Sequence, residues 1–414
     1  MVIGIVCEFD PLHRGHARLL SHARALGADT VVCAMSGSFT QRGSFAALSK
    51  TARAEMAVRC GADLVLELPT PWAMSPAETF ARGGVRLLAL AGADTLLFGS
   101  ECGDLPALRC LADCLDSPTF ADHLTAAPES GLTFAARRQA AAASLLDNAT
   151  AALLQSPNNT LAVEYLRALR HTRSTMTPCT LRREGAGHDG APEGDTASAS
   201  FLRELLRQGR GEAACAYMPT PAADVLRREL AAGRIADGAL CERAILVHLR
   251  AMTEADWRPY DPGNEGLYHR LYQASRDACT VAEMLSAAKT KRYPLARLRR
   301  MVLSAYLQLP PAPERVPYLR VLAATAAGRA HLRCLRDTGA PVLTKPADVP
   351  ALGPAAEELF TLESRCTDLY VLARPDLTQA APGQDYRTTP VNADLKEAFK
   401  SFGGRVCIHC SSTT

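Results

Sequence analysis

Short apolar runs alternate with stretches of helical periodicity over the first hundred residues, and this alternation constrains the fold more than any other feature. The apolar runs cover residues 2–7, 30–35, 63–68 and 95–98. The helical patterns between them cover residues 16–25, 49–59 and 76–90. Strands that are buried on both faces need no polar alternation, and helices that connect parallel strands cover both faces of their sheet. The alternation therefore predicts a doubly wound α/β domain with a parallel sheet.

The next hundred residues continue with helices and one more strand. Residues 105–170 have helical patterns, and a strand is expected at 176–181, before a glycine-rich loop at 184–195. A further helix is expected at 198–207. These elements would complete the α/β domain.

The rest of the chain has a different pattern. From Pro221 onward it is mainly that of amphipathic helices, with proline-rich connectors at 309–317 and 341–354. We therefore divide the chain into an α/β domain at residues 1–210 and a mainly helical domain at residues 211–414. Two units agree with a chain of 414 residues, which is too long for one ordinary hydrophobic core.

Composition and charge narrow the class of protein. Hydrophobic residues make up 48% of the chain and charged residues 21%, as in folded soluble proteins. The first strand has no features of a signal peptide, and the longest apolar runs, such as 87–93, are far shorter than a membrane span. We expect a cytoplasmic protein with no membrane partner. The net charge is only +3, so any contact with nucleic acid must come from a local basic patch.

The 14 cysteines are spread over the whole chain, which is typical of reduced, mostly buried cysteines in a cytosolic protein. Cys407 and Cys410 form a CxxC pair near the C-terminus. A single pair without a second pair at zinc spacing is weak evidence for a metal. We expect no metal role for this tail.

A loop with two histidines follows the first apolar run, at the place where ligands bind in an open parallel sheet. It contains Pro11, which stiffens the backbone, and the sequence His13-Arg14-Gly15-His16. Gly15 leaves room for a ligand, the following helix presents free N–H groups to anions, and histidines can donate to a phosphoryl group. Two solvent-exposed histidines are the alternative. Their position around a glycine, directly after the first strand, favours a nucleotide site.

This four-residue sequence resembles the HIGH-type motif of nucleotidyltransferases, and longer segments narrow the resemblance. They are similar, in the same order, to the tRNA(Met) cytidine acetate ligase family. The segments cover residues 8–16, 35–43, 67–69, 98–101, 156–159, 183–189, 198–203 and 290–293. The family resemblance implies that the chain activates acetate with ATP as acetyl-adenylate. It also implies transfer of the acetyl group to N4 of the wobble cytidine, position 34, of elongator tRNA(Met).

The resemblance implies an ATP site as well, with His13 and His16 as the catalytic pair. The ATP-binding residues that it implies are Val6, Cys7, Glu8, Phe9, Asp10, Pro11, Leu12, His13, Arg14, Gly15, His16, Ala17, Arg18, Leu19, Gly99, Asn158 and Arg183. We add Ser200 and Arg203, because a hydroxyl at a helix N-terminus with an arginine one turn later suits a triphosphate.

Two positions depart from the family pattern. The family usually has Asn at the position of Asp10, whose charge would oppose phosphates unless a metal ion or a neighbouring cation offsets it. It also tends to have Tyr before the His-Asp pair, where this chain has Gly187. This shift leaves Arg182 and Arg183 as candidates for the family's arginine, and we choose Arg183 because Arg-x-Gly-Ala-Gly matches from there.

Several of these residues also have a plainer interpretation. The serines at the start of the 198–207 helix would serve equally as helix caps, Gly99 as a turn residue, and Asn158 as a cap of its own helix. Gln41, Arg42 and Lys50 follow the second strand on the same edge of the sheet. They would contact phosphate or tRNA, or else belong to a solvated loop.

The helical domain contains one local basic cluster, around the start of the helix that Pro294 opens. Its residues are Lys289, Lys291, Arg292, Arg297, Arg299 and Arg300. Positive charge near a helix N-terminus opposes the macrodipole, and contact with RNA phosphates would explain it. A solvated face balanced by acidic neighbours is the alternative. The resemblance to a tRNA enzyme favours RNA.

The expected partners are therefore elongator tRNA(Met) and acetate, and the expected cofactors are ATP and Mg²⁺, although no pair of carboxylates identifies the metal ligands. One alternative is an adenylyltransferase that acts on a phosphorylated cofactor precursor, which would not need a large helical domain. Another is a tRNA-binding protein without catalysis, which the intact histidines disfavour. An aminoacyl-tRNA synthetase is less favoured, because residues 289–291 are a poor substitute for its lysine loop.

Overall fold

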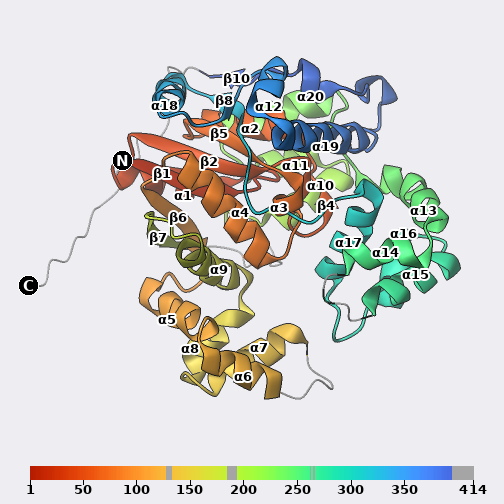
Figure 1. Ribbon diagram of the computed structural model, residues 1–414. Coiled ribbons are helices and arrows are strands. Elements are labelled where there is room, and N and C mark those ends of the chain that lie inside the picture. Colours follow the sequence, from red (N-terminus) through yellow and green to blue (C-terminus); the bar gives the residue numbers. More distant parts are fainter. Residues whose placement is uncertain (127–132, 184–193, 262, 264–265, 394–414) are drawn as a thin grey trace, which may run out of the picture.

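A mixed eight-stranded sheet forms the centre of the computed structural model, which describes residues 1–126, 133–183, 194–261, 263 and 266–393. The strands are β1 (Val2–Cys7), β2 (Thr30–Ser36), β5 (Leu64–Leu68), β6 (Thr95–Ser100), β7 (Thr177–Arg182), β8 (Leu319–Ala324), β9 (Val342–Leu343) and β10 (Val391–Asn392). Their order is β10-β8-β5-β2-β1-β6-β7, and β9 pairs with β8. Figure 1 shows the sheet with helices on both sides.

The strand order reverses direction at β1. From β1 the chain builds outward through β2 and β5 on one side, and through β6 and β7 on the other. All of these pairs are parallel, and only β5 and β8 run antiparallel. In such sheets, ligands bind outside the carboxyl ends of the strands where the order reverses. The fold therefore places the ligand site at the ends of β1 and β6.

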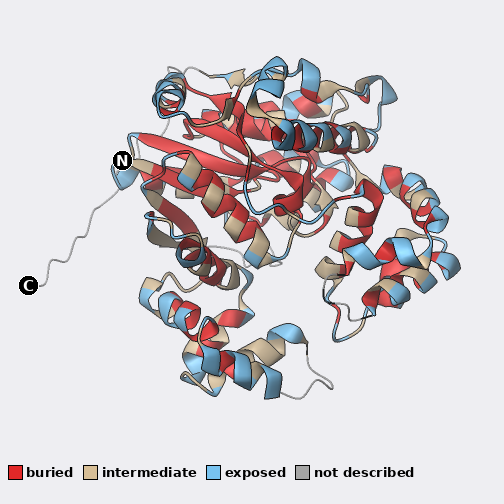
Figure 2. Cartoon of the chain, in the orientation of Figure 1, coloured by how far each residue is buried: buried red, intermediate tan, exposed pale blue. Residues whose placement is uncertain are grey.

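Successive residues of β2 belong alternately to two hydrophobic cores, one on each face of the sheet. One core includes α4 (Ala77–Leu90), α9 (Pro157–His171), α18 (Ala326–Asp337) and α19 (Pro354–Val371). The other includes α1 (Arg14–Ala25), α2 (Lys50–Arg59), α10 (Ala199–Arg207), α11 (Gly211–Cys215) and α12 (Thr220–Ala231). Figure 2 shows that the central strands are buried almost throughout. Burial on both faces explains their uninterrupted apolar runs.

Two groups of helices project from this body (Figure 1). The first group is α5 (Leu105–Leu115), α6 (Pro118–Ala126), α7 (Phe134–Ala143) and α8 (Asn148–Ala152). The second group is α13 (Glu242–Ala251), α14 (Glu254–Trp257), α15 (Leu267–Asp277), α16 (Val281–Ala288) and α17 (Leu295–Leu307). The second group forms a third core around Trp257, which also contains Phe39 and Tyr370 of the main body. It is therefore packed against the sheet domain.

Short elements complete the described structure. They are the helices α3 (Thr70–Ala73) and α20 (Gln384–Arg387), and 3₁₀ turns at Leu153–Gln155, Gly238–Cys241, Arg258–Tyr260, Pro346–Asp348, Pro350–Leu352 and Leu377–Gln379. No helix among the described residues combines the length and the apolar character of a membrane span.

The α/β fold predicted from the sequence is confirmed, including the four strands of the first hundred residues and the later strand β7. Two predictions need correction. No strand was predicted between the apolar run at 30–35 and the helix at 49–59, but this segment contains a small antiparallel hairpin, β3 (Phe39–Thr40) and β4 (Ser44–Phe45). In the region expected to be mainly helical, β8, β9 and β10 join the sheet.

The missed strand β8 has a physical explanation. Its sequence, Leu-Arg-Val-Leu-Ala-Ala, is rich in leucine and alanine, which favour helices. A charged residue, Arg320, interrupts its apolar run, although every residue of the strand is buried. The strand could therefore not be recognised, because a cation interrupts its apolar run and the partners of that cation lie far away in the sequence.

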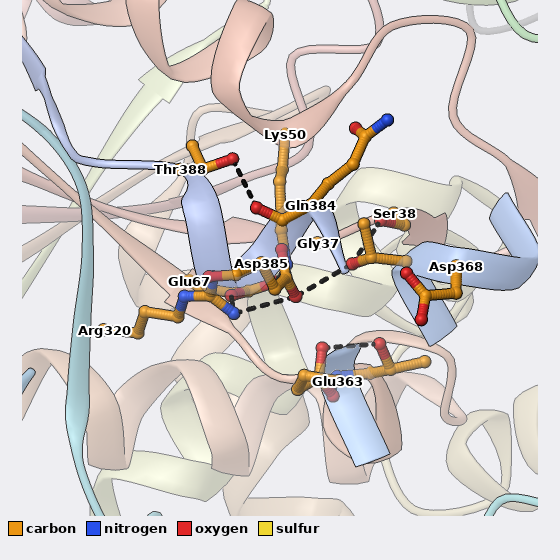
Figure 3. Close-up of polar contacts among 12 residues, drawn as sticks. Gly37, Ser38, Lys50, Glu67, Arg320, Glu363, Asp368, Gln384, Asp385 and Thr388 are labelled. Atoms are coloured by element: carbon orange, nitrogen blue, oxygen red, sulfur yellow. Dashed lines mark hydrogen bonds and ion pairs between the residues drawn. The ribbon is translucent and has the colours of Figure 1, made fainter. Parts of the chain in front are cut away.

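Arg320 belongs to a buried network of charged residues that also contains Lys50, Glu67, Glu363 and Asp385 (Figure 3). Lys50 Nζ lies 2.7 Å from Glu67 Oε1 and 2.8 Å from Asp385 Oδ2. Arg320 Nη1 lies 3.2 Å from Glu67 Oε2 and 3.0 Å from Asp385 Oδ2. The network brings together α2, β5, β8, α19 and α20. Lys50 is therefore neither a phosphate ligand nor part of a solvated loop, and both interpretations of it from the sequence were wrong.

Glu363 takes part in this network as a neutral acid. Its Oε1 accepts a hydrogen bond from Thr70 N at 2.7 Å, and its Oε2 accepts one from the Thr70 hydroxyl at 2.9 Å. Desolvation and the nearby Glu67 carboxylate raise its pKa to about 8. With Glu363 protonated, the charges of Lys50 and Arg320 balance those of Glu67 and Asp385.

Replacement of Glu363 by glutamine is expected to change how stability depends on pH. The unfolded carboxyl titrates near pH 4.5 and the folded one near 8, so folding takes up a proton between these values. The free energy of unfolding of the native protein therefore falls as the pH rises through this window, and the loss is complete above about pH 8. In urea titrations, the free energy of unfolding of Glu363→Gln minus that of the native chain should increase as the pH rises from about 5 to 8. Glu358→Gln, an exposed change on the same helix, is the control. An unchanged pH slope in Glu363→Gln would contradict the neutral acid.

Candidate functional site

A cleft opens at the carboxyl ends of β1 and β6, at the reversal of strand order. Its walls come from the loop after β1, the end of β6, the N-terminal turns of α9 and α10, and part of α4. Most of the predicted ATP-binding residues lie together in its lining. They are Val6, Cys7, Glu8, Phe9, Asp10, His13, His16, Leu19, Gly99, Asn158, Arg183, Ser200 and Arg203.

The other predicted residues of the loop lie outside this cleft. Gly15 and Arg18 line an adjoining pocket, together with both histidines. The residues that line neither cavity are Pro11, Leu12, Arg14 and Ala17. Leu12 is fully buried in the core, and Arg14 Nη1 pairs with Asp195 Oδ2 at 2.7 Å. The structure therefore does not bring these four side chains to the nucleotide site, and a direct contact with ATP is not supported for them.

The two histidines are held by the start of α1. His13 caps this helix, and its Nδ1 accepts a hydrogen bond from Gly15 N at 3.1 Å. His16 Nδ1 accepts one from His13 N at 3.3 Å, and the two rings stack with 3.7 Å between their centroids. Because each Nδ1 accepts a backbone N–H, the ring proton of each neutral histidine lies on Nε2. The pair therefore has two Nε2–H donors that the helix cap does not use.

Both histidines are neutral in the free protein. Desolvation, with Arg183 and Arg203 nearby, lowers the pKa of His13 to about 3. Desolvation and the stacked His13 ring lower the pKa of His16 well below its ordinary value. These rings therefore act on a ligand as hydrogen-bond donors, and the positive charge of the site comes from its arginines.

The loop reaches this geometry through a strained residue. Phe9 has a φ of 48°, in the left-handed region that bulky residues avoid. Its side chain is only 1% exposed, and its ring contacts that of His16 edge-on at 5.1 Å. Such strain persists only where the surroundings enforce it, and it is common at binding sites. Here it turns the chain so that the ring of Phe9 supports His16.

Three side chains tie the loop after β1 to the segment after β2. Glu8 Oε1 accepts from Gln41 N at 2.7 Å, and Asp10 Oδ1 accepts from Ala47 N at 2.7 Å. Arg53 of α2 is fully buried and donates to four backbone carbonyls, those of Glu8, Ser36, Gly37 and Leu48. Arg53 could not be identified from the sequence, because nothing in a single sequence distinguishes a buried arginine from an exposed one.

Arg203 is fixed against the histidine loop. Its Nη1 donates to the backbone oxygen of Asp10 at 2.7 Å, and its Nη2 donates to the Ser200 hydroxyl at 3.1 Å. The same Nη1 lies 3.7 Å from Asp10 Oδ2, an oxygen that has no hydrogen-bond partner among the described residues. Ser198 caps the helix, and both Ser198 and Ser200 line the cleft. Arg203 thus offsets the charge of Asp10, the residue that departs from the family pattern.

Asp10→Asn is expected to strengthen ATP binding. The amide oxygen would keep the bond to Ala47 N, while the negative charge beside Arg203 would be lost. Removing a like charge a few ångströms from a phosphate lowers the free energy of binding by about 1 kcal/mol, or about fivefold in KM for ATP. Asp224→Asn, an exposed change on α12, controls for net charge. A higher KM for ATP in Asp10→Asn would show instead that Oδ2 serves the nucleotide, for example through a divalent ion.

The choice between the two candidate arginines follows from where they lie. Arg183 lines the cleft with the histidines, and a Cβ on Gly99 would lie only 3.3 Å from its Cγ. Arg182 lines only the adjoining pocket and packs against Gly103. The geometry therefore agrees with the choice of Arg183, and the absent side chain at Gly99 leaves room for its stem.

Asn158 and an apolar wall complete the cleft. Glu101 receives hydrogen bonds from Asn158 N and Nδ2, at 3.1 and 2.7 Å, and holds the asparagine at the start of α9. Phe80, Phe98 and Tyr165 line the cleft as well, with 5.5 Å between the rings of Phe98 and Tyr165. The sequence analysis missed this wall, because its side chains have the spacing of ordinary core residues. Gln41 and Arg42, whose role the sequence left open, line the same cleft.

The basic cluster divides into two sets. Arg297 pairs with Asp261 at 3.2 Å, and Arg300 donates to the carbonyl of Gln41 at 3.2 Å. Desolvation and the nearby Arg297 lower the pKa of Arg300 to about 10. The exposed members are Lys289, Lys291, Arg292 and Arg299. Arg297 and Arg300 thus have internal contacts that join α17 to the rest of the protein, and RNA binding by them stays a prediction.

Some sequence-based predictions lie outside the described residues. They concern Cys407, Cys410 and most of the glycine-rich loop, residues 184–193. Within the described residues, no group of three or more His, Cys, Asp or Glu side chains is arranged to hold a metal ion.

The fold and the paired histidines at the reversal of strand order define a HIGH-type nucleotidyltransferase. The profile of the family HIGH Nucleotidyl Transferase matches residues 1–385. The tRNA(Met) cytidine acetate ligase of Syntrophotalea carbinolica is 34% identical, over 94% of this chain and 98% of that protein. The ligase of the same name from Acetivibrio thermocellus is 32% identical, over 93% and 98%. The chain belongs to the tRNA(Met) cytidine acetate ligase family and is an enzyme of the ligase class.

Solved structures extend the similarity to three dimensions. The chain superimposes on Thermotoga maritima TmcAL with a TM-score of 0.89 at 27% identity, over 95% of this chain and 99% of the other. It superimposes on the same protein bound with alpha-thio ATP with a TM-score of 0.87. The resemblance inferred from the sequence segments is therefore confirmed.

Proposed function

We propose that this enzyme activates acetate with ATP as acetyl-adenylate and transfers the acetyl group to N4 of the wobble cytidine, position 34, of elongator tRNA(Met). The observation that carries the proposal is the pair of neutral histidines with Arg183 and Arg203 at the reversal of strand order. The names of the relatives supply the acceptor and the acyl group. The ATP analogue bound by the Thermotoga protein supports the nucleotide.

The first step is an attack of an acetate oxygen on the α-phosphorus of ATP. The new bond joins that oxygen to the phosphorus, the bond from the phosphorus to the bridging oxygen breaks, and pyrophosphate leaves. Negative charge grows on the oxygens around the α-phosphorus. Nε2–H donors of His13 and His16 and the guanidinium of Arg203 suit this charge, because they are held in place before the reaction.

The second step is an attack of cytidine N4 on the carbonyl carbon of the adenylate. The new C–N bond forms, the bond from carbon to the phosphate oxygen breaks, AMP leaves with its electron pair, and N4 releases a proton. No covalent nucleophile of the protein is needed in either step. The protein therefore contributes orientation and charge stabilisation, and the apolar wall of Phe80, Phe98 and Tyr165 suits the adenine base.

Mg²⁺ fits this site only when it binds together with the phosphates of ATP. Among the described lining residues, Asp10 Oδ2 is the one buried carboxylate oxygen that has no hydrogen-bond partner. Mg²⁺ in nucleotide sites takes one or two protein carboxylates and completes its shell with phosphate oxygens and water. When bound to the phosphates, it would neutralise part of their charge, and the KM for ATP of Asp10→Asn distinguishes this case from a metal that Asp10 itself holds.

The test is an exchange of labelled pyrophosphate into ATP, with and without acetate, in the absence of tRNA. Exchange that depends on acetate supports adenylate formation. Addition of elongator tRNA(Met) should then give N4-acetylcytidine in the tRNA, read by mass spectrometry. Exchange without acetate but with a phosphorylated cofactor precursor would favour an adenylyltransferase. Binding of tRNA with no ATP binding would favour a non-catalytic protein.

A further inference from the structure

A second groove lies on the other side of Arg203 from the ATP cleft. Its walls come from the β3–β4 hairpin, the end of α10, residues 235–239, and the helices α13, α16 and α17. It has a volume of about 460 Å³, within the range of about 300–1,000 Å³ that is usual for sites of small molecules. We call it the arginine groove, because Arg203, Arg207 and Arg299 all line it.

The groove and the cleft share a wall. Arg203 lines both of them. Asp10 lines the cleft and Ala47 lines the groove, and the hydrogen bond of 2.7 Å between Asp10 Oδ1 and Ala47 N joins the two sides. The groove therefore lies next to the cleft, with Arg203 and the bond between Asp10 and Ala47 between them.

Three arginines and one carboxylate, Asp237, are the charged residues of the groove lining, so the charge of the groove is positive. Desolvation lowers the pKa of Arg299 of α17, and so do the charges of Arg207 of α10 and of Arg42, which lies in the β3–β4 turn and lines the neighbouring cleft. Arg207 pairs with Glu204, but neither Arg42 nor Arg299 has an ion-pair partner in the part of the chain that the structure describes. Arginines that repel one another are unfavourable in the free protein, so an anion is the ligand that would stabilise them.

The close contact of the hairpin and α17 holds these arginines in place. Gly43 has a φ of 72°, and a Cβ there would lie 2.5 Å from Arg300 N and 2.7 Å from Arg299 C. Arg300 reinforces the contact through its bond to the carbonyl of Gln41. The internal role of Arg300 therefore positions its exposed neighbour Arg299 at the mouth of the groove.

We propose that the arginine groove binds the anticodon loop of the acceptor RNA, with Arg207 and Arg299 on its phosphates, and leads the target cytidine past Arg203 to the adenylate. Resting on the proposed function, this inference adds the surface that binds the acceptor. Single-stranded loops are recognised by phosphate contacts and by splayed bases that stack on aromatic rings. Phe45, half-buried in the groove lining, is an aromatic ring of this kind.

The double variant Arg207→Ala/Arg299→Ala tests the proposal without a change in the ATP cleft. Its matched control is Arg109→Ala/Arg333→Ala, which also removes two exposed arginines, on α5 and α18. Binding of an anticodon stem-loop RNA is measured at several salt concentrations, without ATP or acetate. Each lost phosphate contact lowers the slope of log K against log salt by about 1. The groove variant should lose at least about tenfold in affinity and about 1.5–2 in slope, and the control neither.

Equal affinity and slope in the groove variant and the control would overturn the proposal. Kinetics give a second readout, because kcat/KM for tRNA should fall at least about tenfold more than the rate of acetate-dependent exchange without tRNA. A wild-type protein that binds the RNA through the groove but shows no exchange would refute the proposed function and leave the groove intact. Acetate-dependent exchange together with a groove variant that binds RNA normally would support the proposed function and refute the proposal for the groove.

Discussion

His16→Ala is expected to lower acetate-dependent pyrophosphate exchange at least about 100-fold, because the loss of one fixed hydrogen-bond donor to a developing oxyanion costs about 10²–10³ in rate. The geometry makes His16 a donor through Nε2, since its Nδ1 is engaged by His13 N at 3.3 Å. His22→Ala, a change on the same helix outside the cleft, should exchange at the wild-type rate. Wild-type exchange in His16→Ala would refute the assignment of the site.

Two conservative replacements of His16 distinguish the donor role of its Nε2 from the capping role of its Nδ1. The amide nitrogen of glutamine reaches approximately the position of Nε2 in histidine, and that of asparagine approximately the position of Nδ1. His16→Gln should therefore retain more exchange than His16→Asn, because it returns a donor to the cleft. His16→Asn should resemble His16→Ala in rate. The opposite order would show that Nδ1 is the atom that acts on the nucleotide, and the neutral Nε2–H tautomer would then be wrong.

The order of elements around the histidine loop could be predicted from the sequence because the strands that build it are buried on both faces. An apolar run of this kind, such as Val2–Cys7, by itself indicates a strand that is buried on both faces. The loop after it stands at the strand end that binds ligands, so the identity of His13 and His16 was sufficient to locate the site. Segments that match a family then extended the assignment to Asn158 and Arg183.

The remaining features depend on contacts between distant residues, which no local pattern records. Lys50 and Arg53 are three positions apart, and both are buried cations, one held by carboxylates and the other by carbonyls. In the sequence they look like the charged face of an ordinary helix. The strand that contains Arg320 was missed, and the internal contact of Arg300 in α17 was not foreseen, for the same reason. Each is a cation whose partner lies in another element.

Lys50→Met is expected to be among the most destabilising single changes in this protein, with a loss of about 3–5 kcal/mol in the free energy of unfolding. Lys50 Nζ binds Glu67 and Asp385 at 2.7 and 2.8 Å, and both carboxylates are almost fully buried. Methionine keeps most of the side-chain volume, so the loss would reflect a buried carboxylate that Arg320 alone cannot balance. Lys345→Met, a change of an exposed lysine, should shift stability by less than about 0.5 kcal/mol in urea titrations.

A second substitution distinguishes charge imbalance from lost packing. In Lys50→Met/Asp385→Asn the network again holds one cation, Arg320, and one ionised carboxylate, Glu67, with Glu363 neutral. The amide oxygen of the introduced asparagine would still accept from the Thr367 hydroxyl, which Asp385 Oδ2 now does at 2.9 Å. The double variant should therefore be more stable than Lys50→Met, and the effects of the two single changes should couple by about 1–3 kcal/mol. If the second change destabilises the chain further, the damage in Lys50→Met comes from packing, and the balance of charges does not hold the C-terminal helices to the sheet.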